Sequence, residues 1–257
     1  MNDSVLKTLT VSFVVCLFCS LIVSFAAVSL RDAQNLNKLN DQRIKILKTA
    51  AIYNPEESIE SQFGRLTPKF VDFSNGLLLD EFEDLDLITY DPVYFSKQAD
   101  YSTPVPADLD IAIVKNQENI GKIYLLKDFN NNLEKIILPI RGYGLWGTLY
   151  GYIAIDKDLN TIRGLEFYEH KETPGLGAEV DNPKWKALWD GKKIYKDGVI
   201  EIAVIKGKVD KSNKMADYQV DGLSGATLTS RGVTNMLAFW FSESGYQETL
   251  SKINYDS

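Results

Sequence analysis

Residues 221–230 form the segment whose residue types and spacing most clearly suggest chemistry. Four of the positions before Thr227 carry small residues, namely Gly222, Ser224, Gly225 and Ala226. Small residues let a bulky planar ligand approach the backbone closely. An amphipathic helix follows, and its first turn would offer unpaired N–H groups and the positive end of the helix dipole to a phosphate. Thr227 could then be bonded to that phosphate as well as lying near it.

A plainer interpretation of the same residues stays open. Asp221 and Gly222 are typical of a turn. The hydroxyl of Thr227, Thr229 or Ser230 would then cap the helix, which is a common role for these residue types. Taken without further comparison, the residue types favour this second interpretation.

Two further segments, residues 142–147 and 169–179, combine unusual residue types. In the second, Pro174 and the glycines beside it indicate a tight, stiff turn that leaves backbone N–H groups free for hydrogen bonds. In the first, Trp146 stands among glycines. Its indole either stacks on a flat ring or belongs to the core beside a turn.

The composition excludes several classes of site. The 257 residues carry a formal net charge of −7, which argues against nucleic-acid binding because a phosphate-binding face needs clustered Lys and Arg. With only Cys16 and Cys19, a disulfide framework and a Cys-rich zinc or iron–sulfur site are excluded. His170 is the single histidine, so we predict no metal site. Because charged residues flank it, we expect His170 to be exposed at a strand end and assign it no catalytic role.

Residues 8–30 predict a membrane anchor. These 23 uncharged residues would span about 35 Å as a helix, enough for a hydrocarbon core of about 30 Å. A cleaved signal peptide stays open as an alternative, because Ser24 and Ala26 form a small-x-small site. Cys16 and Cys19 lie within the span, where such thiols usually pack. More basic residues follow the span than precede it, so a positive-inside count would keep the rest of the chain in the cytoplasm.

Residues 31–110 are expected to form a helix and an acidic lobe. Apolar residues continue at helical spacing to about residue 52. The acidic lobe (residues 53–110) holds 13 Asp and Glu against 3 Lys and Arg, and we expect short irregular elements in it. Its charge is interpreted as a solvated face, with a docking surface as the sharper alternative.

Residues 111–257 predict a second, strand-rich domain. Aliphatic and β-branched runs between turn residues indicate strands at 111–114, 122–126, 135–140, 150–155, 162–168 and 199–205. Helices should begin at Asn182 and Pro183 and again near Thr229. Strands joined mainly by hairpins, with helices at intervals, predict an α+β fold with a largely antiparallel sheet.

Three motifs taken together resemble a known family. They are Ser-Gly-Ala-Thr at 224–227, Glu-Thr-Pro-Gly-Leu-Gly at 172–177 and Gly-Leu-Trp at 144–146. They are similar to those of the FMN-binding domain in the C subunit of Na⁺-translocating NADH:quinone reductases. The likeness extends over nearly the whole chain, because one N-terminal span and a long intermediate lobe precede the flavin domain in that family as well.

This resemblance implies a flavin site. It implies that Thr227 is esterified to the phosphate of FMN by a separate flavin transferase. The remaining cofactor-binding residues implied by the motifs are Ser224, Gly225, Ala226, Thr173, Leu176, Gly177, Leu145 and Trp146. Leu176 and the turn around it would contact the flavin ring, and Trp146 would cover one of its faces.

The resemblance also implies a place in a complex. The chain would relay electrons within a membrane assembly of six subunits that reduces ubiquinone with NADH and exports Na⁺, and it would not be active alone. Its domain would lie on the periplasmic side of a bacterial inner membrane, with residues 1–7 in the cytoplasm. This orientation is opposite to the one that the charge count indicates, and we follow the resemblance because the motifs are more specific than the count.

Two alternatives remain at this point. The first is the G subunit of the Rnf electron-transport complex, which shares two of the motifs but is typically shorter. The second is a membrane-tethered binding module without a cofactor, in which the acidic lobe docks a partner.

Overall fold

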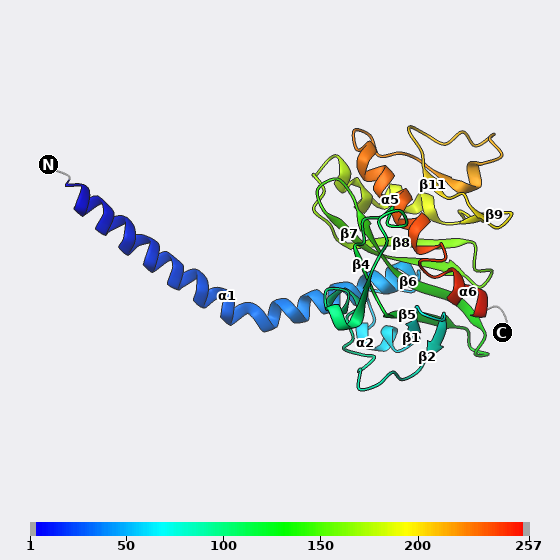
Figure 1. Ribbon diagram of the computed structural model, residues 1–257, viewed down its shortest axis with the longest axis horizontal. Helices are drawn as coiled ribbons and strands as arrows, with labels where there is room; N and C mark the ends of the chain where they lie inside the picture. The colour runs from blue at the N-terminus through cyan, green and yellow to red at the C-terminus, as the bar shows by residue number, and fades with distance from the viewer. Residues whose placement is uncertain (1–3, 254–257) are drawn as a thin grey trace. The chain divides into compact units, whose positions relative to one another are not determined.

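A computed structural model describes residues 4–253 of the chain (Figure 1). The chain divides into two units, Met1–Gln42 and Arg43–Ser257. The first unit consists of most of one long helix, and the second contains the sheet and all remaining elements.

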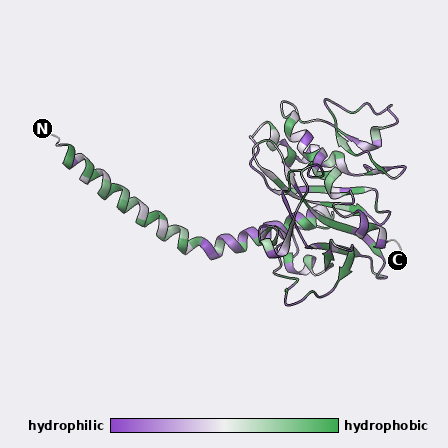
Figure 2. Cartoon of the chain, viewed as in Figure 1, coloured by the Kyte–Doolittle hydropathy of each residue, from purple (hydrophilic) through white to green (hydrophobic). Residues whose placement is uncertain are grey.

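Helix α1 runs over Val5–Thr49. Its side chains are exposed as far as residue 39, and Figure 2 shows the N-terminal part as predominantly hydrophobic. Within the described part of the chain it is the one helix with the length and composition to cross a membrane. A helix that leaves so many apolar side chains uncovered fits a membrane anchor, because water would make that surface unfavourable. Cys16 and Cys19 are free and exposed on it.

A six-stranded antiparallel sheet forms the centre of the second unit, in the order β2-β1-β5-β6-β7-β8. The strands are β1 (Leu66–Asp72), β2 (Leu77–Leu79), β5 (Ile120–Lys127), β6 (Leu133–Tyr143), β7 (Thr148–Asp156) and β8 (Ile162–Glu169). The α+β class with a largely antiparallel sheet is thereby confirmed. The strands expected at 122–126, 135–140, 150–155 and 162–168 are present and slightly longer than expected.

Both faces of this sheet are covered. On one face, helix α5 (Thr227–Trp240) buries Val233 and Leu237 in the cluster that contains Ile136 and Leu138 of β6. On the other face, the last turns of α1 bury Ile46 and Leu47 in the cluster that contains Ile137. The alternation of side chains along a strand therefore places α5 and the end of α1 on opposite faces of β6.

Polar contacts also fix the end of α1 to the sheet. Lys135 donates a 2.9 Å hydrogen bond from its Nζ to the carbonyl oxygen of Ala50. A Cβ added at Gly164 of β8 would lie 2.3 Å from the carbonyl oxygen of Thr49, so the two backbones pass at close range. Residues 43–50 are thus a structural part of the second unit.

The acidic lobe contains short elements, as expected, and shares a small apolar cluster with the central sheet. Phe70, Tyr90 and Ile120 form this cluster, and the ring of Phe95 stacks on Tyr90. The short elements are α2 (Ile59–Phe63), α3 (Pro92–Phe95), the 3₁₀ turn η1 (Ala99–Tyr101) and β3 (Ser102–Pro104), which pairs with β4 (Asn116–Glu118). Strands β1 and β2 fall within the same range of residues but belong to the central sheet.

A lysine is buried where the lobe meets the sheet. Lys122 of β5 is 6% exposed, and its Nζ donates to the carbonyl oxygens of Ile88 and Tyr90 at 3.2 and 3.4 Å. Burial lowers the pKa of Lys122 to about 8, against the opposing effect of Asp86 and Asp91.

The prediction of a strand at 111–114 is wrong. Ile113 and Lys115 have φ values of 55° and 69°, in the left-handed region that a strand excludes. The Asp110 carboxylate accepts the N–H groups of Val114 and Lys115 at 2.6 and 2.8 Å, so a side chain takes the backbone bonds that a neighbouring strand would have used.

The elements after β8 are mostly short. They are η2 (Gly177–Asp181), α4 (Pro183–Lys186), η3 (Ala187–Trp189), β9 (Tyr195–Lys196), β10 (Val199–Ile200), β11 (Ala203–Val204), η4 (Ala216–Tyr218), β12 (Gln219–Val220) and α6 (Gln247–Ile253). The helix expected at Asn182 and Pro183 is present, and the side-chain Oδ1 of Asn182 accepts the N–H of Lys184 at 3.0 Å as its cap. The single strand expected at 199–205 is instead divided into β10 and β11, and β11 pairs in parallel with β12.

Candidate functional site

Helix α5 begins at Thr227, two residues before the expected start, and no side chain caps it. The residue before it is Ala226, whose carbonyl oxygen accepts the N–H of Ser230 at 3.0 Å. Among residues 4–253, the N–H groups of Thr227, Leu228 and Thr229 have no acceptor. The interpretation in which a hydroxyl of this segment caps the helix is therefore wrong, and the first turn presents free donors at its positive end.

The three hydroxyl residues of this turn differ in accessibility. Thr227 is exposed. Thr229 is completely buried and donates a 2.5 Å hydrogen bond to Oε2 of Glu172. Ser230 is 5% exposed, and its Oγ accepts the N–H of Leu223 at 3.1 Å. Thr227 is thus the hydroxyl that a ligand or another protein can reach.

The loop before α5 is held from both sides. A Cβ added at Gly222 would lie 2.2 Å from the carbonyl oxygen of Ile205, so only glycine allows this approach. The indole N–H of Trp185 donates to the Asp221 carbonyl oxygen at 2.8 Å. Gly225 has φ +71°, a conformation that glycine adopts without the steric cost a side chain brings. These contacts fix the loop in position, so that Thr227 has a defined place at the surface.

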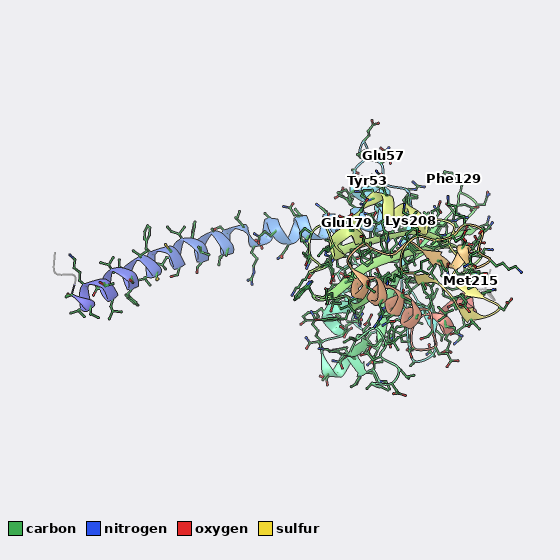
Figure 3. All side chains as sticks on the ribbon, turned by 90° about the horizontal axis from the view of Figure 1, so that it is seen from above. Tyr53, Glu57, Phe129, Glu179, Lys208 and Met215 are labelled. Carbon is green, nitrogen blue, oxygen red and sulfur yellow. The ribbon has the colours of Figure 1, made fainter. Side chains whose placement is uncertain are left out.

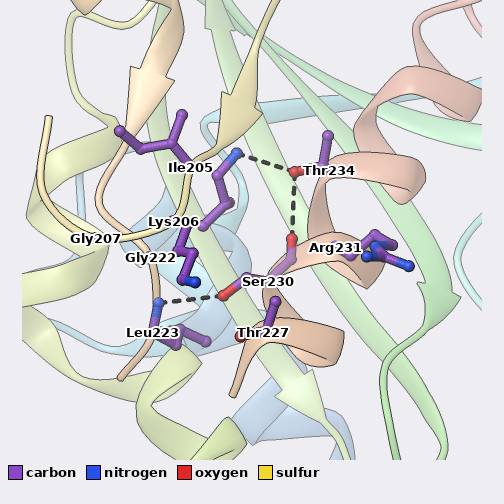
Figure 4. Close-up of a pocket in the computed structure, with 10 residues that line it drawn as sticks. Ile205, Lys206, Gly207, Gly222, Leu223, Thr227, Ser230, Arg231 and Thr234 are labelled. Atoms are coloured by element: carbon purple, nitrogen blue, oxygen red, sulfur yellow. Dashed lines mark hydrogen bonds between the residues drawn. The ribbon is translucent and has the colours of Figure 1, made fainter. Parts of the chain in front are cut away.

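A pocket of about 220 Å³ lies beside Thr227 (Figure 4). Its lining comes from the end of β11, from the loop before α5 and from the first two turns of α5, and comprises Val204, Ile205, Lys206, Gly207, Gly222, Leu223, Thr227, Ser230, Arg231 and Thr234. Lys206 and Arg231 are exposed and give this site positive charge. The pocket therefore combines an accessible hydroxyl, free helix N–H groups and two cations, which is a donor set for a phosphate.

The pocket is smaller than most sites that enclose a whole organic ligand, which occupy roughly 300–1,000 Å³. A ligand held here by a phosphate would extend over the neighbouring surface. That surface carries exposed apolar side chains from two of the sequence motifs, since Trp146 is 63%, Leu176 45% and Leu145 38% exposed. The chain thus offers hydrogen-bond donors and cations for a phosphate, with apolar side chains near them, and this combination fits FMN.

Two of the motifs and the first turn of α5 meet at one buried carboxylate. Oε1 of Glu172 accepts the N–H groups of Leu145 and Trp146 at 2.9 and 3.0 Å, while Oε2 accepts the Thr229 hydroxyl. In addition, a Cβ added at Gly225 would lie 2.9 Å from a methyl carbon of Leu176. The fold therefore brings together segments that lie far apart in the sequence.

Close packing of α5 on β6 adds to this convergence. A Cβ at Gly232 would lie 2.4 Å from the carbonyl oxygen of Tyr143, and one at Gly142 would lie 2.7 Å from Met236 Cβ. Small residues at this crossing let the helix approach the strand closely, which sets the first turn of α5 beside the turn at 144–147.

The structure places the predicted site residues in two groups. Ser224, Gly225, Thr173, Leu176, Leu145, Trp146 and Thr227 are exposed or partly exposed around the pocket and the two turns. Ala226 and Gly177 are buried and act as packing and spacing positions. Thr173 also closes its own turn, because its carbonyl oxygen accepts the N–H groups of Leu176 and Ala178, both at 3.1 Å.

His170 is not the exposed residue that its charged neighbours led us to expect. Its side chain is only 15% exposed and its Nε2 lies 2.9 Å from Asp181 Oδ2. Its Nδ1 accepts the N–H of Glu172 at 3.2 Å. Flanking charge misled the sequence interpretation, because it does not reveal the contacts of the ring with Asp181 and with the backbone of Glu172.

Sequence reasoning missed the carboxylate of Glu172 and the cations Lys206 and Arg231 as parts of the site. Glu172 was noted only as the first residue of a motif. Lys206 and Gly207 follow a strand, and a lysine with a glycine at such a place is only a weak indication of a phosphate site. It becomes informative once the loop at 221–227 is known to lie beside it.

Comparisons with known proteins identify the family of the chain. A model of the FMN-binding domain family matches residues 144–242. The chain is 45% identical to the C subunit of the Na⁺-translocating NADH-quinone reductase of Pseudomonas aeruginosa, over 98% of this chain and 97% of the relative. It is 39% identical to the C subunit of the same reductase from Yersinia pestis, over 98% and 94% of the two chains.

A solved structure shows the same fold. The crystal structure of NqrC from Shewanella oneidensis superposes with a TM-score of 0.78 at 29% identity and covers 86% of this chain and 99% of its own. Near full-length similarity to the NqrC relatives, together with the matching FMN-binding domain, decides against the Rnf alternative and against a module without a cofactor site. This chain belongs to the NqrC family, whose members are the subunits with an FMN-binding domain in the Na⁺-translocating NADH-quinone reductase, an oxidoreductase complex.

Proposed function

We propose that Thr227 carries FMN through a phosphoester to its Oγ and that the chain relays electrons within the assembled reductase. The observation that supports this most directly is the exposure of Thr227 at the uncapped start of α5, beside a pocket that also contains Lys206 and Arg231. Bound FMN would supply the redox chemistry, since the isoalloxazine ring accepts and gives up electrons.

The residues of the chain have distinct tasks in this proposal. Thr227 supplies the oxygen of the ester bond. The free N–H groups at the start of α5, with Lys206 and Arg231, stabilise the charge that stays on the phosphodiester. Leu145, Trp146 and Leu176 provide an apolar surface for the ring. All of these residues lie after residue 110, while β1 and β2 complete the sheet that supports them.

A covalent bond has a clear benefit for an electron carrier. Dissociation of a tethered cofactor would need hydrolysis of an ester, so flavin loss would be slow even in a dilute compartment. Because Thr229 is buried and bonded to Glu172, it is not accessible to the separate flavin transferase that we expect to form the ester. Thr227 is therefore the attachment point that the accessibility of these side chains supports.

The remaining proposals concern location and partners. We propose that α1 anchors the chain in the bacterial inner membrane and that the second unit lies in the periplasm. Electrons would come from and go to cofactors of the other members of an assembly of six subunits. NADH oxidation, ubiquinone reduction and Na⁺ export would belong to that assembly.

The intact mass of the full-length protein from its own host tests the attachment. We expect an increase equal to FMN less one water, a yellow-green fluorescent band after denaturing electrophoresis, and loss of both in Thr227→Ala. Thr227→Ser is the matched control, because it keeps the hydroxyl and should keep the flavin. A Thr227→Ala protein that is still fluorescent after denaturation would contradict the proposal.

A further inference from the structure

Glu172 has no task in the proposed function, yet its carboxylate connects the turn at 144–147 with the first turn of α5. Its side chain lies between the turn at 144–147 and the first turn of α5 and is 5% exposed. It accepts hydrogen bonds of 2.9, 3.0 and 2.5 Å from Leu145 N–H, Trp146 N–H and the Thr229 hydroxyl. A buried carboxylate that accepts three hydrogen bonds is costly to remove, because each donor would then be left without a partner.

Two glycines of the motifs make room for this carboxylate. A Cβ at Gly144 would lie 2.5 Å from Oε1 of Glu172, and a Cβ at Gly177 would lie 2.3 Å from Oε2. Neither glycine has a positive φ, so the need for glycine at these two positions comes from space and not from backbone conformation. The two glycines and the carboxylate therefore form one arrangement.

The backbone of Glu172 is fixed as well. Its N–H donates to Nδ1 of His170 at 3.2 Å, which requires the ring proton to be on Nε2, where it is donated to Asp181 Oδ2 at 2.9 Å. Asp181 ends η2, the short helix that begins at Gly177. The turn at 172–177 is thus also held by a chain of hydrogen bonds in which α5 takes no part.

We propose that Glu172 is a positioning residue for the flavin site. Its carboxylate fixes Leu145 and Trp146 at a set place relative to the first turn of α5, and so relative to Thr227, before any cofactor is attached. The proposal rests on the proposed function in so far as Thr227 carries the flavin. It adds that Glu172 positions the apolar surface for the ring before the flavin is attached, and that Glu172 need not touch the ring itself.

Amide hydrogen exchange tests the positioning without the cofactor. The full-length chain is compared in detergent on a Thr227→Ala background, so that no variant carries flavin at that residue. In Glu172→Ala we expect exchange at Leu145 and Trp146 to increase at least tenfold, while amides at the centre of β6 change less than twofold. Glu172→Gln should stay within about threefold of the parent, because its amide oxygen can accept both N–H groups and its amide nitrogen can donate to Thr229.

Glu166→Ala is the matched control. Glu166 is a carboxylate with a 13% exposed side chain that bridges Lys45 and Lys186 and is not bonded to the turn at 144–147. Its loss should leave exchange at Leu145 and Trp146 unchanged. Glu172→Asp keeps the charge but shortens the side chain, and it serves where Glu172→Ala does not fold. It should increase exchange at the same two amides at least fivefold.

A second arm uses the protein with Thr227 intact. Glu172→Ala should still acquire flavin, and the visible circular dichroism of that flavin should fall by at least half, whereas Glu172→Gln and Glu166→Ala keep the parent signal.

Unchanged exchange at Leu145 and Trp146 in Glu172→Ala or Glu172→Asp would overturn the proposal. An equal increase over the whole of β6 to β8 would also overturn it, since it would indicate a purely structural role. Absence of flavin from the parent protein would contradict the proposed function and leave the exchange result valid.

Discussion

The guanidinium of Arg141 and the carboxylate of Glu118 are joined by two hydrogen bonds of 3.1 and 2.5 Å, with both side chains buried. The same guanidinium donates to the carbonyl oxygen of Asn116 at 3.1 Å and lies over the ring of Trp240. This ion pair connects β4, at the boundary of the acidic lobe, with β6 in the central sheet.

We expect Glu118→Ala to lower the free energy of unfolding by about 3–5 kcal/mol, because it leaves Arg141 buried without its partner. The double variant Glu118→Leu/Arg141→Met should lose less stability than Glu118→Ala alone, since neither charge of this pair then stays buried. Urea titration followed by tryptophan fluorescence measures both. Glu248→Ala, which breaks an exposed pair with Lys252, is the control and should cost less than about 1 kcal/mol. Equal losses in Glu118→Ala and Glu248→Ala would contradict the prediction.

The lowered pKa of Lys122 predicts that the free energy of unfolding rises with pH. Its pKa is about 8 in the folded chain and 10.5 without the fold, so between these values the unfolded chain binds more protons. Stability should increase from about pH 8 by up to about 1.4 kcal/mol per pH unit. Above pH 10 the buried tyrosines oppose this, because burial raises the pKa of Tyr195 to about 12 and loss of their protons favours unfolding.

Urea midpoints measured at pH 7, 8, 9 and 10 check this dependence. Lys122→Met should abolish the rise between pH 8 and 10 and should be more stable than the parent at pH 7. Lys69 of β1 is a suitable control, because it is paired with exposed Asp80, so Lys69→Met should keep the rise. A parent protein whose midpoint stays constant from pH 8 to 10 would show that Lys122 is charged in the fold over that range.

Gly222→Ala should disturb the loop that presents Thr227. The added Cβ would lie 2.2 Å from the Ile205 carbonyl oxygen, and this contact with backbone cannot be relieved by rotating a side chain. We expect a loss of stability of about 1–3 kcal/mol and at least a fivefold lower flavin content per protein, measured by absorbance after denaturation. Lys208→Ala, at an exposed position outside the pocket, should cost less than about 0.5 kcal/mol and leave the flavin content within about twofold of the parent. Full flavin content in Gly222→Ala would mean that the loop tolerates displacement.

Lys206 should assist flavin attachment through its charge. Lys206→Gln removes positive charge from the pocket beside Thr227, so we expect the initial rate of flavin attachment by the purified transferase to fall three- to tenfold. The effect should shrink as salt is added, because salt screens exposed charges. Lys208→Gln changes a nearby exposed lysine outside the pocket and should act weakly. Lys208, which is labelled in Figure 3, is exposed. Equal rates in the two variants would remove Lys206 from the site.

Orientation in the membrane can be tested with an impermeant thiol reagent. With Cys16 and Cys19 replaced by serine, a cysteine introduced at the exposed position Phe129 should react in intact cells whose outer membrane is permeabilised. A cysteine introduced at Ser4 should react only after the inner membrane is opened. The reverse pattern would support the charge count over the family resemblance.

The sequence predicted those features that depend on local pattern or on a specific motif. The four long strands after residue 120 have runs of apolar residues bounded by turn residues, and they formed as expected. The segment at 111–114 has the same apolar character, but the Asp110 side chain accepts the N–H groups of Val114 and of the following Lys115, and no periodicity reveals such a bond.

The site was predictable in part for a similar reason. Thr227 and its neighbours belong to one short motif, so the sequence could indicate them, and their role in flavin attachment stays a prediction. Glu172 acts on residues 27 and 57 positions away, and Lys206 reaches the site only because β11 pairs with β12. Such roles arise from tertiary contacts, which a single sequence does not show.

The packing of residues 43–50 under the sheet determines where the chain can be cut. Removing residues 1–33 deletes the lipid-facing stretch and retains Ile46, Leu47 and Ala50, so a water-soluble protein is the expected product. Removing the whole helix to Thr49 would uncover the apolar face around Ile137 and Tyr152, and that shorter protein should aggregate. The membrane anchor and the globular body therefore share their junction residues, and an expression boundary drawn at the end of the helix would damage both.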